Sequence, residues 1–233
     1  MVPPHCAHRR AIRERLRGYS PEYRRYPLST PQSARMRCLL FSQPPQESFV
    51  PTLMVIVAST RQARIGHTVA DWVISAANER ADLTVDVADL QEIGLPFFDE
   101  AHPPMMGQYE LPHTLAWAER VAAADAFLIV SPEYNGSYPG VLKNALDYLL
   151  AEWQGKPAGI IGYGAYPESR MIGQLDFVLR NLKLDRTSID LQVQTPWTML
   201  DNDGKLVAPV ELNDTLASML DELSLAGAEV VAA

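Results

Sequence analysis

The sequence has only two cysteines, and both lie outside the region that carries the signals of a fold. Cys6 and Cys38 fall within the first fifty of the 233 residues. Residues 51–233 therefore offer no thiol for nucleophilic catalysis, for a disulfide or for a zinc site with cysteine ligands. This composition is consistent with a reducing compartment, and we expect the protein to be cytoplasmic.

The sequence also lacks the motifs of several other protein classes. No apolar run approaches the roughly 18 residues that a membrane-spanning helix needs. The first predicted strand is followed by neither a P-loop nor a G-x-G-x-x-G loop, and no G-x-S-x-G elbow of a serine hydrolase is present. The acidic residues and histidines between positions 99 and 113 match no spacing of metal ligands. We expect no metal and no membrane contact.

Charge is distributed unevenly along the chain. Residues 1–50 hold nine arginines, no lysine and three glutamates, a net charge of +6 that leaves −14 for residues 51–233 out of a total of −8. Nucleic acid is therefore not expected as a partner of the acidic part. We predict that residues 1–50 form an extension without a stable fold of its own. Our first interpretation of this extension is that the natural start of the protein lies downstream, at Met36 or Met54. An organelle transit peptide and a basic arm for an anionic surface are the alternatives.

Hydrophobic patterns predict a parallel sheet in residues 51–233. Continuous apolar runs are typical of strands covered on both faces, whereas alternation of apolar and polar residues is typical of edge strands. Three runs are continuous and two alternate, which predicts an α/β, doubly wound, five-stranded sheet in the flavodoxin-like order 2-1-3-4-5. The continuous runs are 53–58, 126–130 and 158–161, and the alternating ones are 84–88 and 189–194.

Helical periodicity separates these strands. The predicted helices cover residues 66–80, 111–123, 141–151, 172–182 and 212–223. Strict alternation of strand and helix implies right-handed crossovers, so the ends of the first and third strands should flank one ligand crevice. The longest predicted loop, 94–110, is rich in phenylalanine and methionine.

The loop after the first strand has the composition of an anion site. It runs from Ser59 to Gly66, includes Arg61 and Arg64, and leads directly into a helix. A helix N-terminus offers unpaired N–H groups and the positive end of its dipole, and arginine binds phosphate through charge-assisted hydrogen bonds. The alternative is that both arginines face solvent without a ligand.

The loop after the third strand is stiff and polar. It reads Ser-Pro-Glu-Tyr-Asn-Gly-Ser-Tyr-Pro-Gly over residues 131–140. Two prolines fix φ, and Asn135 and Gly136 tolerate positive φ, so the backbone can direct several polar groups at a flat ligand. A turn-rich loop without a ligand is the alternative.

Together these loops, with Lys143-Asn144-Ala145, Glu152-Trp153 and Gly155-Lys156-Pro157, resemble the NADPH-dependent FMN reductase family over about residues 53–200. The resemblance implies a flavodoxin-like fold, bound FMN, and NADPH or NADH as electron donor. It implies that Ser59, Arg61, Arg64, Ile65 and Gly66 hold the phosphate. Pro132, Glu133, Tyr134, Asn135 and Gly136 would contact the isoalloxazine ring, with Tyr163 and Gly164 on its other side.

The resemblance further implies a reductase of a small acceptor, such as a quinone, an azo compound, a flavin or a metal ion. Because the cofactor carries the electrons, we name no catalytic side chain. A homodimer or homotetramer with the apolar 94–110 loop at its interface is expected. The family often has a second glycine where this chain has Ala165, and residues 166–169 form an insertion that reshapes the substrate side. An FMN electron carrier and a flavin-free interaction module are the alternative functions.

Overall fold

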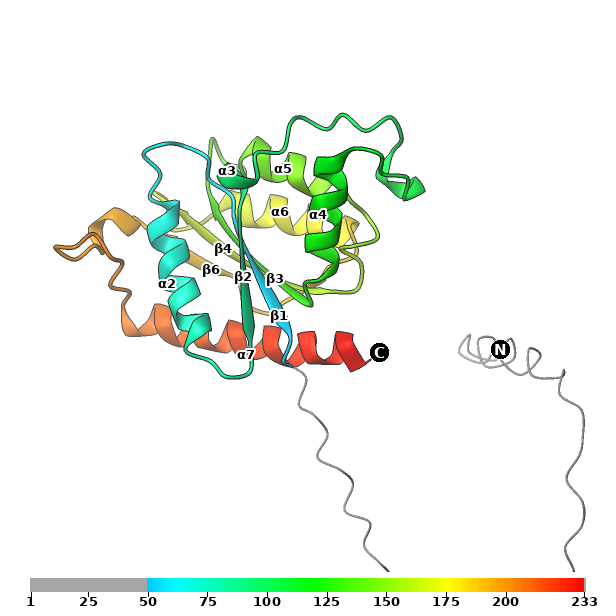
Figure 1. Cartoon of the computed structure of the whole chain (residues 1–233). Coiled ribbons are helices and arrows are strands. Elements are labelled where there is room, and N and C mark those ends of the chain that lie inside the picture. The colour runs from blue at the N-terminus through cyan, green and yellow to red at the C-terminus, as the bar shows by residue number, and fades with distance from the viewer. Residues whose placement is uncertain (1–49, 233) are drawn as a thin grey trace, which may run out of the picture. The chain divides into compact units, whose positions relative to one another are not determined.

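Parallel strands form the centre of the protein (Figure 1). The structure, a computed structural model, describes residues 50–232, so predictions for residues 1–49 lie outside it. The strand order is β2-β1-β3-β4-β5, and β6 also pairs with β4, which confirms the predicted topology. The strands are β1 (Thr52–Val57), β2 (Thr84–Asp89), β3 (Ala126–Pro132), β4 (Pro157–Gly164), β5 (Asp185–Arg186) and β6 (Leu191–Gln194).

Burial of the strands follows the hydrophobic patterns. Every residue of β3 is buried, and so are nearly all residues of β1 and β4. β2 is largely accessible, and in β6 Leu191 and Val193 are buried while Gln192 and Gln194 are not. The three continuous runs are thus the central strands, and the two alternating segments lie at the edges, as predicted.

The edge strand next to β4 consists of two pieces, where the sequence predicted one. β5 pairs with Pro157 and Ala158, whereas β6 pairs with residues 161–164. Between them, the Thr187 N–H and the Arg186 side chain both donate to the Ala158 carbonyl oxygen. The almost fully buried Arg186 side chain also pairs with Asp176 and Asp190. These bonds take the place of the regular strand-to-strand hydrogen bonds, and the edge strand is therefore divided into β5 and β6.

Helices cover both faces of the sheet. On one face, α2 (Gly66–Asn78) and α7 (Val210–Ala232) pack on the sheet through Val73, Leu220 and their neighbours. On the other face lie α4 (Pro112–Ala122), α5 (Gly140–Asp147) and α6 (Arg170–Asn181). The short α3 (Leu90–Ile93) and two 3-10 turns, Pro104–Met106 and Pro196–Thr198, were not predicted.

Two local differences from the predicted helices have physical causes. α3 is a single turn, too short for a periodic pattern, and it is defined by its ends: the Asp89 carboxylate accepts from the Gln91 N–H, and Gly94 is left-handed with φ 59°. α5 ends at Asp147, and the chain then turns toward β4 through Gly155, whose φ is 74° and whose N–H donates to the Lys183 carbonyl oxygen.

The register brings three loops to one end of the sheet. Val57 pairs with Val130, and Pro132 pairs with Tyr163, so the chain leaves β1, β3 and β4 at neighbouring points. In an open parallel sheet this end is where ligands bind. Among the helices of residues 50–232, none is both long and apolar enough to cross a membrane.

Candidate functional site

The loops after β1 and β3 contact each other. Ser59 is almost completely buried, and its Oγ lies 3.1 Å from the Tyr134 Oη, within hydrogen-bond distance. The Arg61 guanidinium carbon lies 5.8 Å from the centre of the Tyr134 ring, in a cation–π arrangement. The cationic loop and the proline-stiffened loop therefore meet at one place.

The loop after β1 keeps several backbone donors free. Within residues 50–232, the N–H groups of Ile65, Gly66 and His67 donate no hydrogen bond to the protein. They lie at the start of α2, and Ile65 caps that helix without a side-chain hydrogen bond. Free N–H groups at a helix N-terminus, next to the Ser59 hydroxyl and the Arg61 guanidinium, form a donor set that fits a phosphate.

Arg64 has a different environment from Arg61. Its Nη1 donates to the Asp89 Oδ1 at 2.7 Å and to the Ser59 carbonyl oxygen at 2.6 Å, and its Nη2 completes a bidentate pair with Asp89. The hydrogen bond that Arg64 donates to Asp89 raises the pKa of Arg64. In Asp89, burial acts to raise the pKa, but the hydrogen bonds from Arg64 and the Gln91 N–H lower it overall. In this arrangement Arg64 holds the loop to the end of β2.

Gly66 leaves room for a buried tyrosine. A Cβ at position 66 would lie 2.2 Å from the Tyr163 Oη and 3.2 Å from the Ser59 Cβ. Tyr163 is 4% exposed, and this burial raises the pKa of its hydroxyl well above the usual range. The Tyr163 side chain therefore packs beneath the loop after β1 and does not line the neighbouring pocket.

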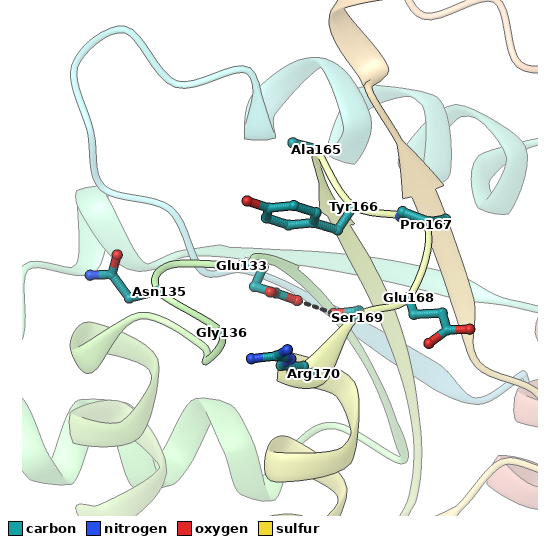
Figure 2. A pocket seen from close by; sticks show the side chains of 9 residues that line it. All are labelled: Glu133, Asn135, Gly136, Ala165, Tyr166, Pro167, Glu168, Ser169 and Arg170. Atoms are coloured by element: carbon teal, nitrogen blue, oxygen red, sulfur yellow. Dashed lines mark hydrogen bonds between the residues drawn. The ribbon is translucent and has the colours of Figure 1, made fainter.

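A pocket of about 760 Å³ lies between the loops after β3 and β4 (Figure 2). Its lining comprises Glu133, Asn135, Gly136 and residues 165–170. Asn135 and Gly136 adopt positive φ of 53° and 81°, and within the described part of the chain their N–H groups have no acceptor. The pocket has the size of a cofactor or substrate site, with free donors at one side.

Glu133 connects the two loops that form this pocket. Its N–H donates to the Tyr163 carbonyl oxygen at 3.1 Å. Its Oε2 accepts from the Ser169 Oγ at 2.8 Å and from the Met171 N–H at 3.3 Å. Ser169 is the N-cap residue of α6, but its side chain makes no capping hydrogen bond to the helix backbone, and Glu133 instead supplies a carboxylate to that helix N-terminus. The carboxylate thus shapes the pocket.

Comparison with known proteins identifies the family. The family model for NADPH-dependent FMN reductases matches residues 51–184, which include both loops and the pocket. The chain belongs to this family. It is accordingly an NAD(P)H-dependent flavin oxidoreductase with FMN as its cofactor.

Curated relatives agree with this assignment, and a solved structure agrees with the fold. An NAD(P)H-dependent FMN reductase of Schizosaccharomyces pombe is 40% identical over 136 residues, or 58% of this chain and 68% of that protein. A 2-hydroxy-1,4-benzoquinone reductase of a Burkholderia species is 34% identical over 158 residues, or 59% of this chain and 81% of that protein. For the fold, the flavoenzyme FerB of Paracoccus denitrificans superposes with a TM-score of 0.62 at 24% identity, covering 76% of this chain and 98% of that one.

The residues that the sequence indicated for FMN fall into four groups in this reductase. Ser59 and Arg61 both contact Tyr134, while Glu133, Asn135 and Gly136 line the pocket. The Arg64 guanidinium is bound to Asp89, and the Tyr163 hydroxyl is packed against Gly66. The remaining predicted residues lie in these loops or at the ends of the elements beside them: Ile65, Gly66, Pro132 and Gly164.

Sequence reasoning missed two residues of this site. Asp89 stands at the end of β2, and its pairing with Arg64 becomes visible only when β2 lies beside β1. Arg170 lines the pocket at the start of α6, where a cation is electrostatically unfavourable. Arg170 lies two residues before the predicted helix 172–182, and a basic residue just ahead of a helix start is the signal that could have identified it.

Replacement of Asp89 by asparagine is expected to lower the free energy of unfolding by about 1–3 kcal/mol at pH 7, because it leaves the part-buried Arg64 without its counter-charge. Because folding lowers the pKa of Asp89, its carboxylate stabilises the fold above the unfolded pKa, and this stabilisation is lost as pH falls through the folded pKa. Urea unfolding from pH 7 down to about pH 3 should show the difference shrinking. A constant difference would contradict the role of the charge.

Replacement of Gly66 by alanine is expected to lower the free energy of unfolding by about 1–3 kcal/mol, because the new Cβ overlaps the Tyr163 Oη. Tyr163→Phe in the same chain removes that oxygen and should recover part of the loss. Urea unfolding of both single variants and the double variant measures this coupling. Gly173→Ala is the control, since nothing lies within 4 Å of its Cβ position. Strictly additive effects would exclude the proposed overlap.

Proposed function

We propose that FMN binds across the two contacting loops, with its phosphate at the loop after β1 and its ring beside the loop after β3. The contact between Ser59 and Tyr134, with Arg61 against the same ring, carries this proposal. The phosphate would accept hydrogen bonds from the Arg61 guanidinium and from the free N–H groups at the start of α2. Arg64 would act indirectly on the phosphate, by holding the loop after β1 in place through its hydrogen bond to Asp89.

The ring would occupy the pocket next to Asn135 and Gly136. Bound FMN supplies a carrier that takes two electrons from NAD(P)H and delivers them to an acceptor. The free N–H groups of Asn135 and Gly136 can stabilise negative charge on the ring without any protein rearrangement. Glu133 holds the opposite wall by its bonds to Ser169 and Met171. No side chain is needed as an acid or base to accept the hydride.

The acceptor in this proposal is a small molecule. The names of the relatives include a quinone reductase and FMN-dependent NADPH-azoreductases. A quinone, an azo compound, a flavin or a chelated metal ion would each reach a pocket of this size from solvent. NAD(P)H and the acceptor would use the same face of the ring in turn, in a ping-pong sequence.

We further propose a homodimer or homotetramer with the 94–110 loop at the interface. Phe97 is 89% exposed, Met105 77% and Met106 58%, although large apolar side chains on one loop are usually covered. The loop is nevertheless held in place, since the Tyr148 hydroxyl donates to the Pro96 carbonyl oxygen at 3.1 Å. A cytoplasmic location remains a prediction from the sequence.

Purified protein saturated with FMN is expected to lose its absorbance near about 450 nm when NADPH is added without oxygen, and to recover it on addition of a quinone. Arg61→Gln should raise the dissociation constant for FMN about tenfold or more, because one charge-assisted phosphate contact is lost. Lys205→Gln removes one exposed positive charge elsewhere and is the control. Bleaching that requires an added reductase protein would instead identify an electron carrier, and absence of flavin binding would overturn the proposal.

A further inference from the structure

Among residues 50–232, Arg170 is the one arginine that lines the pocket. It is the first residue of α6 and is exposed. In Figure 2 its guanidinium lies on the side of Gly136, across the pocket from Tyr166. The contact is close, because a Cβ on Gly136 would lie 3.7 Å from the Arg170 Cδ. The side chain thus lies along the loop expected to hold the flavin ring.

The positive charge of Arg170 has no partner in the described part of the chain. Residues 50–232 give its guanidinium neither a hydrogen bond nor an ion pair. Two carboxylates belong to the pocket: Glu133 is engaged with Ser169 and Met171, and Glu168 is directed away from Gly136 in Figure 2. The helix dipole adds to the imbalance, since a cation at a helix N-terminus is unfavourable. An unpaired cation in such a place is available for an anionic ligand.

Tyr166 adds an aromatic surface to the same pocket. It is 68% exposed, and Figure 2 shows its ring extending from the loop after β4 toward the side of Asn135. A planar ligand can stack on this ring while its edge reaches Arg170 on the other side. The pocket therefore combines the features that suit a flat molecule with negative charge at its edge.

One relative indicates which molecule has this chemistry. It is a 2-hydroxy-1,4-benzoquinone reductase, 34% identical over 158 residues. A hydroxyl conjugated with a quinone carbonyl is a vinylogous acid, so such a compound is an anion at neutral pH. Its enolate oxygen and the adjacent carbonyl oxygen lie side by side, which matches the two parallel donors of a guanidinium.

We propose that Arg170 determines acceptor specificity by binding the oxyanion edge of a planar hydroxyquinone. This inference rests on the proposed function, in which the acceptor is reduced in this pocket. The overall change is NAD(P)H, a proton and the quinone giving NAD(P)+ and the hydroquinone, so two electrons are transferred and one proton is taken from solvent. Arg170 contributes to binding and orientation and exchanges no proton.

The test compares a charged acceptor with its neutral parent on full-length protein saturated with FMN. NADPH oxidation is measured without oxygen, with 2-hydroxy-1,4-naphthoquinone and with 1,4-naphthoquinone. Arg170→Gln should raise the KM for the hydroxyquinone about 10- to 100-fold, as expected for a lost charge-assisted contact, and change the KM for the parent by less than about twofold. Arg170→Lys keeps the positive charge but loses the two parallel N–H donors of the guanidinium, so its KM for the hydroxyquinone should be intermediate.

Arg180→Gln is the matched control, because it removes an arginine from the last turn of the same helix, where the side chain is 66% exposed. It should leave both KM values unchanged. An equal loss for both quinones in Arg170→Gln would overturn the inference. So would a rise in the KM for NADPH but not for NADH, since Arg170 would then bind the donor's extra phosphate. Failure of the unaltered protein to reduce either quinone would instead refute the proposed function.

Discussion

The structure of the site depends on how the loop after β3 is held between its two neighbours. On one side the Tyr134 hydroxyl lies against Ser59, and on the other Glu133 binds Tyr163 through its N–H and the start of α6 through its carboxylate. These contacts are possible because parallel pairing brings the carboxyl ends of β1, β3 and β4 to one edge of the sheet. A single loop thereby fixes both ends of the crevice, where we propose that the phosphate and the ring of FMN bind.

The arginines around this crevice have separate functions that follow from their surroundings. Arg64 is paired with Asp89 and bound to the Ser59 carbonyl oxygen, so its charge is compensated inside the protein. Arg61 rests on an aromatic ring, which offers it a weak interaction that a phosphate can replace. Arg170 has no counter-charge in residues 50–232. In our proposals, the two arginines of the crevice without a carboxylate partner in residues 50–232, Arg61 and Arg170, are the ones that bind anions.

Much of this architecture could be predicted from the sequence, because strands that are buried on both faces consist of continuous runs of apolar residues. Continuous apolar runs identified β1, β3 and β4, and the loops after β1 and β3 were identified by arginine, proline and Asn-Gly. The Arg64–Asp89 pair could not be predicted, since its members are separated by a helix and meet only through the β1–β2 register. The contact between Tyr163 and Gly66 could not be predicted from the sequence either. Nor could the interruption of the edge strand by the Arg186 side chain.

The two walls of the pocket are built differently, and this difference has a consequence for specificity. The Asn135–Gly136 wall presents free backbone N–H groups, which in the proposed function would bind the flavin ring regardless of the neighbouring side chains. The wall at residues 165–170 presents Tyr166, Glu168 and Arg170, whose side chains decide what fits opposite the ring. Substitutions in the second wall can therefore change the acceptor while the cofactor remains bound, provided that Glu133 still holds the loop through Ser169 and the Met171 N–H.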